Sequence, residues 1–387
     1  MLQGQVHPDF APVAQELRRA LAHRSSEAGG GAVAVYHRGE LVVDAWGGHR
    51  TADGDPWERE TAVLSFSTTK GVVATVAHRL VDRGLLDVDA PVADYWPEFA
   101  AAGKARITVR HLLSHDAAMH RLRGLVPDAH AMLNWDSMVD ALGAAEPAWE
   151  PGTRMGYHGV TYGWLVGEVI RRVTGTSVDV AIQTEVVAPL GLGEMHVGWP
   201  ADRRGDRADL LVNMSPTARF EAGTHRAERV RAVRPAIDAF VVPAFTDFIR
   251  SEEVYAGELP ALNGCFRARD LARLYSVLAN DGVDGSTRYI GSETLRRATT
   301  VQRPGRRPDA VVGFPMAWRL GFHLAATSRG VIPNGFGHFG FGGSGAWASP
   351  DDDLAVAFTC NRVAGTPFGD FRMLRIGAAA RRAAQRR

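Results

Sequence analysis

The spacing of apolar residues along the chain predicts strands near both ends. Residues 30–48, GGAVAVYHRGELVVDAWGG, read as two apolar runs around a tight Arg38-Gly39 turn, which predicts a β-hairpin. Residues 345–361, GAWASPDDDLAVAFTCN, read as a strand, a Pro-Asp turn and a second strand. Strand patterns from the two ends of the chain are therefore available to form one sheet.

Helical periodicity dominates the rest of the chain. Residues 67–83 carry apolar side chains at helical spacing, which predicts an amphipathic helix. Residues 200–260 are polar and without clear periodicity, so we interpret them as an insertion. Further helices are expected at residues 9–24, 108–115 (capped by Thr108), 156–173, 267–282 and 370–386.

These elements predict an α/β (α+β) fold. An antiparallel sheet would be built from both chain ends and flanked by helices, with a mostly helical region inserted in the middle. The expected division is a discontinuous sheet domain at 1–80 and 265–387, and a helical region at 81–264 with a variable insertion at about 200–260. A chain of 387 residues is long enough to bury a sizeable core in either region.

Composition excludes several classes of protein. With 45% hydrophobic and 22% charged residues the chain is not largely disordered, and a net charge of +1 gives no reason to expect nucleic acid or an anionic membrane as partner. No apolar run approaches the ~18 residues of a membrane span, and the start of the sequence does not resemble a signal peptide. Cys265 and Cys360 are far apart, which favours two reduced thiols. We therefore expect a cytoplasmic location.

Ser67 and Lys70 are the first candidates for chemistry. Residues three apart share one face of a helix, and here they stand at its start. Unpaired backbone N–H groups at that end can stabilise an oxyanion, and partial desolvation can lower the pKa of a lysine until it acts as a base. The alternative is a serine that only caps the helix and a solvated lysine, and the spacing alone does not choose between them.

Three segments, in order, resemble the serine β-lactamase-related family. FSTTKGVVATVAHRLVDRGLLDVDAPVADYWPEF contains Ser-x-x-Lys, the nucleophile motif of β-lactamases and penicillin-binding proteins. Residues 151–175 are similar to the segment with the Tyr-x-Asn motif, and residues 336–361 to the segment with Lys-Thr-Gly. The resemblance covers most of the chain. It is closest to the class C-like branch, and within that branch to the family VIII carboxylesterases.

The resemblance implies roles for three side chains. Ser67 would be the acyl-accepting nucleophile. Lys70 would be its base, or would hold Tyr157 as a phenolate that takes the proton, and Tyr157 would return a proton to the leaving group. The sequence does not divide these roles, because a coupled lysine and tyrosine titrate together. Without the other motifs Tyr157 would read as a packed aromatic residue.

The third segment implies further site residues. The oxyanion hole would be formed by the N–H of Ser67 and by one on the strand after Gly340, that of Phe341. His338 stands where the family has the lysine of Lys-Thr-Gly, and it would bond to Tyr157 or the substrate, or simply pack in its strand.

Two departures from the family pattern bear on the substrate. Gly159 replaces the asparagine of Tyr-x-Asn, and His338-Phe339-Gly340 replaces Lys-Thr-Gly. In β-lactamases that asparagine and that lysine contact the amide and the carboxylate of the drug. Glycine has no side chain for the first contact, and a mostly neutral histidine is a weaker anchor for a carboxylate. We therefore expect a neutral ester as substrate rather than a β-lactam.

The sequence thus predicts a serine hydrolase that forms an acyl-Ser67 intermediate, most consistent with a carboxylesterase for small acyl esters. Alternatives are a β-lactamase, a D-amino-acid peptidase or amidase, an acyltransferase (transesterase), and a non-catalytic binding relative. The expected partner is a small-molecule ester or amide, with no nucleic acid and no membrane, and the oligomeric state stays open.

No cofactor and no metal are expected. His111 and His115 are four residues apart, with His120 close by, but the glutamate of the zincin pattern is missing. Packing is the favoured role for these histidines. Ser344 lies in FGGSGA, which does not fit the lipase-type nucleophile elbow, so it is no rival to Ser67.

Overall fold

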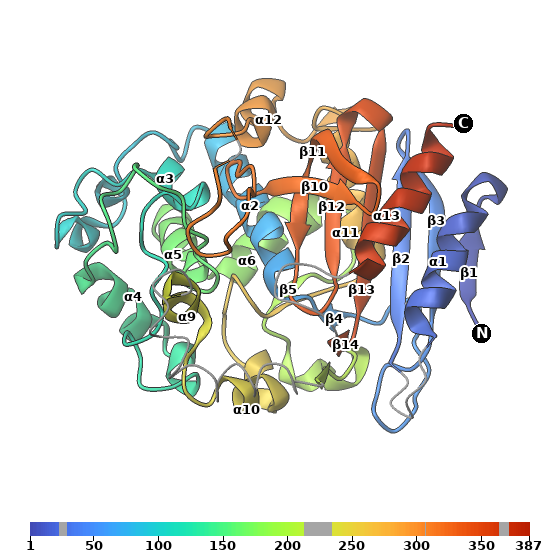
Figure 1. The fold of residues 1–387 in the computed structure, drawn as a ribbon, viewed down its shortest axis with the longest axis horizontal. Coiled ribbons are helices and arrows are strands. Elements are labelled where there is room, and N and C mark those ends of the chain that lie inside the picture. Colours follow the sequence, from blue (N-terminus) through green and yellow to red (C-terminus); the bar gives the residue numbers. More distant parts are fainter. Residues whose placement is uncertain (23–28, 213–233, 306, 364–370) are drawn as a thin grey trace.

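The computed structural model describes residues 1–22, 29–212, 234–305, 307–363 and 371–387 (Figure 1). Its largest sheet has seven strands in the order β1-β3-β2-β13-β12-β11-β10, and every neighbouring pair is antiparallel. The strands are β1 Gln3–Val6, β2 Gly31–His37, β3 Glu40–Gly47, β10 His323–Thr327, β11 Gly330–Phe339, β12 Gly345–Ser349 and β13 Leu354–Cys360. The predicted sheet from both chain ends is therefore confirmed.

The two hairpins read from the sequence have the expected turns. Arg38 and Gly39 join β2 to β3 with φ of 53° and 78°. Two central residues in the left-handed region give a turn whose twist matches that of the strands it joins. Between β12 and β13 the chain turns at Pro350–Asp352.

Side chains alternate across the sheet and build a core on each face. On β2, Val33 and Val35 face α1 (Ala11–Leu21) and α13 (Phe371–Ala384), whereas Ala34 belongs to the opposite core. β13 repeats this alternation, with valine and phenylalanine on one face and alanine on the other. The alanine face is covered by α11 (Ala268–Ala279), because small side chains let a helix approach closely. Both ends of the chain lie on the sheet side of the molecule (Figure 1).

A mostly helical region lies beside the sheet, and α2 (Thr69–Asp82) packs between the two (Figure 1). The remaining helices are α3 Val109–Leu113, α4 Trp135–Ala144, α5 Tyr162–Thr174, α6 Val178–Ile182, a π-helical turn Gln183–Val187, α7 Ala188–Leu190, α9 Arg234–Phe240, α10 Phe245–Arg250 and α12 Ser292–Thr299. The short strands are β4 Val63–Leu64, β5 His196–Val197, β6 Leu211–Val212, β7 Gly264–Phe266, β8 Val283–Asp284, β9 Thr287–Arg288 and β14 Arg362–Val363.

One predicted helix boundary is wrong, and it affects the site. The helix expected at 156–173 begins only at Tyr162, because the N–H groups before it bond elsewhere. Gly156 N donates to the carbonyl of His115 at 2.9 Å, and Tyr157 N to the carboxylate of Asp309 at 3.1 Å. The helix expected from residue 67 is present, with a 3₁₀ turn at Phe66–Thr68 that leads directly into α2 at Thr69.

The boundaries of the two predicted regions stay a prediction, and part of the expected insertion, residues 213–233, lies outside the described residues. Among the helices of the described residues, none is both long and apolar enough to cross a bilayer.

Candidate active site

Ser67 lies in a strained turn between β4 and α2. It is the middle residue of a 3₁₀ turn, Phe66–Thr68, and Phe66 has a φ of 46°. A bulky residue in the left-handed region is a costly conformation that surrounding contacts have to hold. Thr69 Oγ1 donates to the Phe66 carbonyl at 2.5 Å, and the Phe66 ring packs edge-on against that of Phe341 with centroids 5.5 Å apart. The turn is thus fixed from two sides.

The structure brings Ser67, Lys70 and Tyr157 together. Lys70 Nζ lies 2.9 Å from Ser67 Oγ, and Tyr157 OH lies 2.9 Å from the same oxygen. Lys70 Nζ is also 5.1 Å from the centroid of the Tyr157 ring. Ser67 and Lys70 are three residues apart where the 3₁₀ turn leads into α2, whereas Tyr157 lies in the loop before α5. A hydroxyl, an amine and a phenol therefore meet within hydrogen-bonding distance.

The surroundings of Lys70 suit a neutral amine. The side chain is fully buried, and Nζ donates to the carbonyls of Gly159 at 2.7 Å and Ala261 at 2.9 Å. Burial lowers the pKa of Lys70 well below its usual value of 10.5. A neutral amine has two N–H groups and one lone pair. The two carbonyls take the N–H groups, so the lone pair faces Ser67 Oγ and can accept its proton.

Lys104, the other lysine of the chain, also has three hydrogen-bond partners, but all three are carbonyls, whereas one partner of Lys70 is a hydroxyl. It is also buried, and its Nζ donates to the carbonyls of Ala101 at 2.9 Å, Gly143 at 2.9 Å and Ala145 at 2.6 Å. A carbonyl can only accept, so these three bonds need the three N–H groups of an ammonium. The Ser67 hydroxyl beside Lys70 can also donate, so the site of Lys70 can hold a neutral amine, whereas the purely structural site of Lys104 cannot.

Asp309 holds Tyr157 from behind. Its Oδ1 accepts hydrogen bonds from the backbone N–H groups of Tyr157 at 3.1 Å, Val311 at 2.8 Å and Val312 at 3.0 Å. Its Oδ2 accepts one from Trp318 Nε1 at 2.8 Å. The Trp318 ring stacks on the Tyr157 ring, with centroids 5.1 Å apart and an interplanar angle of 18°. One buried carboxyl therefore positions both the backbone of Tyr157 and the ring stacked on it. Asp309 could not be recognised from the sequence, since RRPDAVV carries no known motif.

The segment after β11 lies against the nucleophile turn. A Cβ built on Gly340 would lie 2.2 Å from the carbonyl oxygen of Ser65, so only glycine permits this approach. Gly340 N donates to the Ser344 carbonyl at 2.7 Å, and Thr68 Oγ1 donates to the same carbonyl at 3.2 Å. The predicted residues Gly340 and Phe341 thus neighbour Ser67. The oxyanion hole formed by the N–H groups of Ser67 and Phe341 stays a prediction.

His338 is packed rather than bonded to Tyr157. It is buried, its Nδ1 lies 3.1 Å from the Phe339 carbonyl, and its Nε2 has no hydrogen-bond partner among the described residues. Burial lowers its pKa well below 6.5, with nearby His323 and Lys70 adding to the effect. The ring lies 6.2 Å from that of Tyr157, centroid to centroid. A neutral histidine therefore stands at this position, and its predicted contact with substrate stays a prediction.

The three histidines considered as metal ligands contact a helix start or aromatic rings. His111 Nδ1 accepts from the N–H of Thr108 at 3.1 Å and completes the capping box of α3. His115 packs against Trp318 with ring centroids 4.2 Å apart, and His120 lies over Trp149 at 4.6 Å. The described part of the chain holds no group of three histidine, cysteine, aspartate or glutamate side chains suited to a metal ion.

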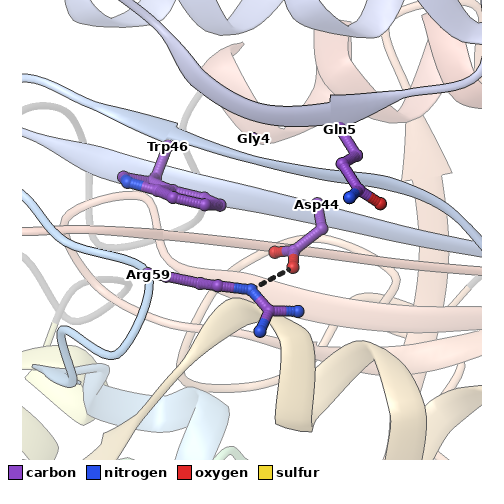
Figure 2. A pocket seen from close by; sticks show the side chains of 5 residues that line it. All are labelled: Gly4, Gln5, Asp44, Trp46 and Arg59. Carbon is purple, nitrogen blue, oxygen red and sulfur yellow. Dashed lines mark hydrogen bonds and ion pairs between the residues drawn. The ribbon is translucent and has the colours of Figure 1, made fainter.

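A pocket with a volume of about 430 Å³ lies beside β1 and β3, at the edge of the sheet (Figure 2). It is lined by Gly4, Gln5, Asp44, Trp46 and Arg59. Asp44 and Arg59 form an ion pair at 2.9 Å across it. Because these two charges satisfy each other, we assign the pocket no chemical role.

Comparison with known proteins agrees with the geometry. A model of the family described as Beta-lactamase matches residues 16–381. The Esterase/beta-lactamase LipL of Mycobacterium tuberculosis is 35% identical over 363 residues, which make up 93% of this chain and 83% of that protein.

Solved structures show the same similarity in three dimensions. A family VIII carboxylesterase superimposes with a TM-score of 0.87 and 35% identity, over 99% of this chain and 100% of that one. A penicillin-binding protein homologue from Caulobacter crescentus gives a TM-score of 0.83 and 31% identity, over 98% of this chain and 100% of that one.

Proposed function

The chain belongs to the beta-lactamase family and is a serine hydrolase, and from this premise we propose that it is a carboxylesterase acting on small acyl esters. The observation that carries the proposal is that Ser67 Oγ lies within 2.9 Å of both Lys70 Nζ and Tyr157 OH. A nucleophile with a base and a proton donor at hand is what acyl transfer through a covalent intermediate requires.

In the proposed acylation step, Ser67 Oγ forms a bond to the ester carbonyl carbon while its proton passes to Lys70 Nζ. The negative charge on the carbonyl oxygen is stabilised by the N–H groups of Ser67 and Phe341. Collapse of this intermediate breaks the ester C–O bond, and the leaving oxygen takes the Tyr157 proton, which the proton on Lys70 then replaces. Water attacks the acyl-Ser67 carbonyl in the same way and regenerates the hydroxyl.

Lys70 is the better candidate for the base. Burial lowers the pKa of Lys70 and raises that of Tyr157, because in each case it disfavours the charged form. Both shifts favour a neutral amine and a protonated phenol in the free site. This supports proton transfer from Ser67 to Lys70, with Tyr157 as the acid.

A substrate panel tests the proposal directly. We expect nitrophenyl esters of short acids to be hydrolysed with a kcat/KM at least about 100-fold above that for a chromogenic cephalosporin or D-alanyl peptides, because Gly159 has no side chain to bind an amide and a neutral His338 is a weaker anchor for a carboxylate than a lysine. A preference for the cephalosporin or the peptides would contradict it. Faster turnover with added alcohol would favour an acyltransferase, and no adduct with a fluorophosphonate probe would favour a non-catalytic binding protein.

We also propose a cytoplasmic location. Cys265 and Cys360 are both buried and form no disulfide, which suits a reducing compartment.

Replacing Tyr157 by phenylalanine tests the role of the phenol. We expect kcat to fall by about 10²–10⁴-fold for alkyl esters, whose leaving group needs a proton, and much less for nitrophenyl esters, whose leaving group does not. Measuring kcat against the pKa of the leaving alcohol checks this. The control is Tyr255→Phe, because the buried hydroxyl of Tyr255 has no hydrogen-bond partner among the described residues. An equal loss for both ester classes would contradict the proposed role.

Replacing Asp309 by asparagine tests its action as a positioning residue. An amide NH₂ cannot accept, so either the backbone N–H groups or the Trp318 indole N–H loses its partner. We expect a loss of about 1–3 kcal/mol in the free energy of unfolding. Since the Tyr157 phenol then drifts from Ser67, we also expect kcat to fall on the order of tenfold to 100-fold with little change in KM. A destabilised variant with unchanged kcat would show that Asp309 has a structural role only.

A further inference from the structure

The ring of Phe240 lies directly against Gly159. A Cβ built on Gly159 would lie 2.1 Å from Cε1 of that ring, 2.7 Å from Cζ and 2.9 Å from Cδ1. No real side chain tolerates such distances, so the ring occupies the space that any side chain at position 159 would need. The two residues are 81 positions apart in the sequence, and nothing in either local pattern predicts the contact.

Phe240 is held in place by the helix that carries it. Its neighbours Ile237 and Ala239 on α9 are fully buried. The carbonyl of Asp238 accepts hydrogen bonds from the backbone N–H groups of Leu122 at 2.8 Å and Arg123 at 3.0 Å. The helix is therefore anchored to the body of the protein both by apolar burial and by backbone bonds.

The ring is also close to the reacting groups. Gly159, on which it rests, provides the carbonyl that accepts from Lys70 Nζ at 2.7 Å. The centroid of the Phe240 ring is 6.0 Å from that of Tyr157, the side chain whose OH contacts Ser67. Phe240 is only partly buried, and the apolar cluster that it joins contains Met155, Tyr157, Ala236, Ala239, Val311, Val312, Met316 and Trp318.

When Ser67 attacks a bound ester, the carbonyl carbon has four groups around it. The proposed mechanism assigns a position to three of them. Ser67 Oγ is the first, the N–H groups of Ser67 and Phe341 receive the oxygen, which is the second, and the Tyr157 phenol meets the leaving oxygen, which is the third. The fourth group, the acyl chain, would then lie against the Phe240 ring beside Gly159. We propose that Phe240 closes the acyl pocket and restricts the enzyme to short, apolar acyl groups, an inference that rests on the proposed function.

The chemistry of the Phe240 ring defines the substrate class. A phenylalanine ring offers neither a hydrogen-bond donor nor an acceptor, so an acyl chain bearing an amide would lose its partners on entering. The ring also takes up space that a longer chain would need. The preferred substrates are therefore esters of short-chain apolar acids, and an acyl group with an amide is rejected.

The test compares acyl chains with a constant leaving group. We would measure kcat/KM for nitrophenyl esters from acetate to octanoate in the wild type, Phe240→Ala, Gly159→Ala and the double variant Gly159→Ala/Phe240→Ala. For Phe240→Ala we expect the octanoate-to-acetate ratio to rise about tenfold or more. Gly159→Ala is expected to lose activity toward all esters, and the double variant to recover much of it, because removing the ring makes room for the methyl group. Phe245→Ala, which removes a phenylalanine from α10, is the control and should leave the ratio unchanged.

An unchanged ratio in Phe240→Ala would overturn the proposal. Wild-type activity in Gly159→Ala would also overturn it. If Gly159→Ala does not fold, the ratio in Phe240→Ala alone still decides. Failure of the proposed function itself would look different, because the wild-type protein would then hydrolyse none of the esters and take up no fluorophosphonate.

Discussion

Replacing Ser67 by alanine is expected to lower kcat for ester hydrolysis on the order of 10⁴-fold or more, with little change in KM. The hydroxyl lies 2.9 Å from both Lys70 Nζ and Tyr157 OH, and alanine has nothing to form the acyl bond. The substitution removes one oxygen atom without crowding the turn, so the fold should persist.

The measurement combines steady-state kinetics with a fluorophosphonate probe and mass spectrometry. The wild type is expected to gain one adduct, on Ser67, and Ser67→Ala none. Ser65→Ala is the matched control, since the hydroxyl of this buried neighbour donates to the Val63 carbonyl at 2.9 Å and not to the reacting groups. An adduct on another residue, or turnover that survives in Ser67→Ala, would refute the acyl-Ser67 intermediate.

Replacing Lys70 by arginine is expected to cost on the order of 10³-fold or more in kcat/KM, because a guanidinium stays protonated at any working pH and cannot accept the Ser67 proton. The wild type should also show a characteristic pH dependence. Burial lowers the pKa of Lys70, and the active form is the neutral amine. Activity is therefore expected to be lost as pH falls through this lowered pKa, and to be retained at a pH where an exposed lysine would still be charged.

Lys104→Arg provides the matched control, because Lys104 is equally buried and bonded to three carbonyls but is not part of the site. We expect this variant to lose stability while its kcat/KM and pH profile stay close to those of the wild type. Lys70→Ala, with less bulk than arginine, separates loss of the base from overcrowding. A Lys70→Arg protein that keeps the wild-type pH profile would exclude Lys70 as the base.

The parts of the fold that follow local rules were predicted from the sequence. The Arg38-Gly39 hairpin, the β12–β13 hairpin and α11 each depend on residues adjacent in the chain. β1 was not predicted, because its residues QGQV carry no apolar alternation, and it forms only because the edge of β3 accepts it. A short polar edge strand is determined by its partner more than by its own sequence.

In the site, too, contacts between residues close in sequence could be predicted, whereas contacts between distant segments could not. The nearness of Ser67 and Lys70 follows from their spacing, whereas Tyr157 could be named only from a resemblance to known motifs. The predicted helix start at 156 was wrong because Asp309, far along the chain, takes up the N–H of Tyr157. The contact of Phe240 with Gly159 is likewise long-range. Contacts of this kind appear only when the chain is folded.

The burial of both lysines has a practical consequence. The chain has 44 basic residues, but its two ε-amino groups lie inside, each surrounded by oxygen atoms of the protein. Reagents that acylate amines in water, such as succinimidyl dyes, bifunctional cross-linkers or activated resins, would therefore find neither of these two ε-amino groups exposed on the folded protein.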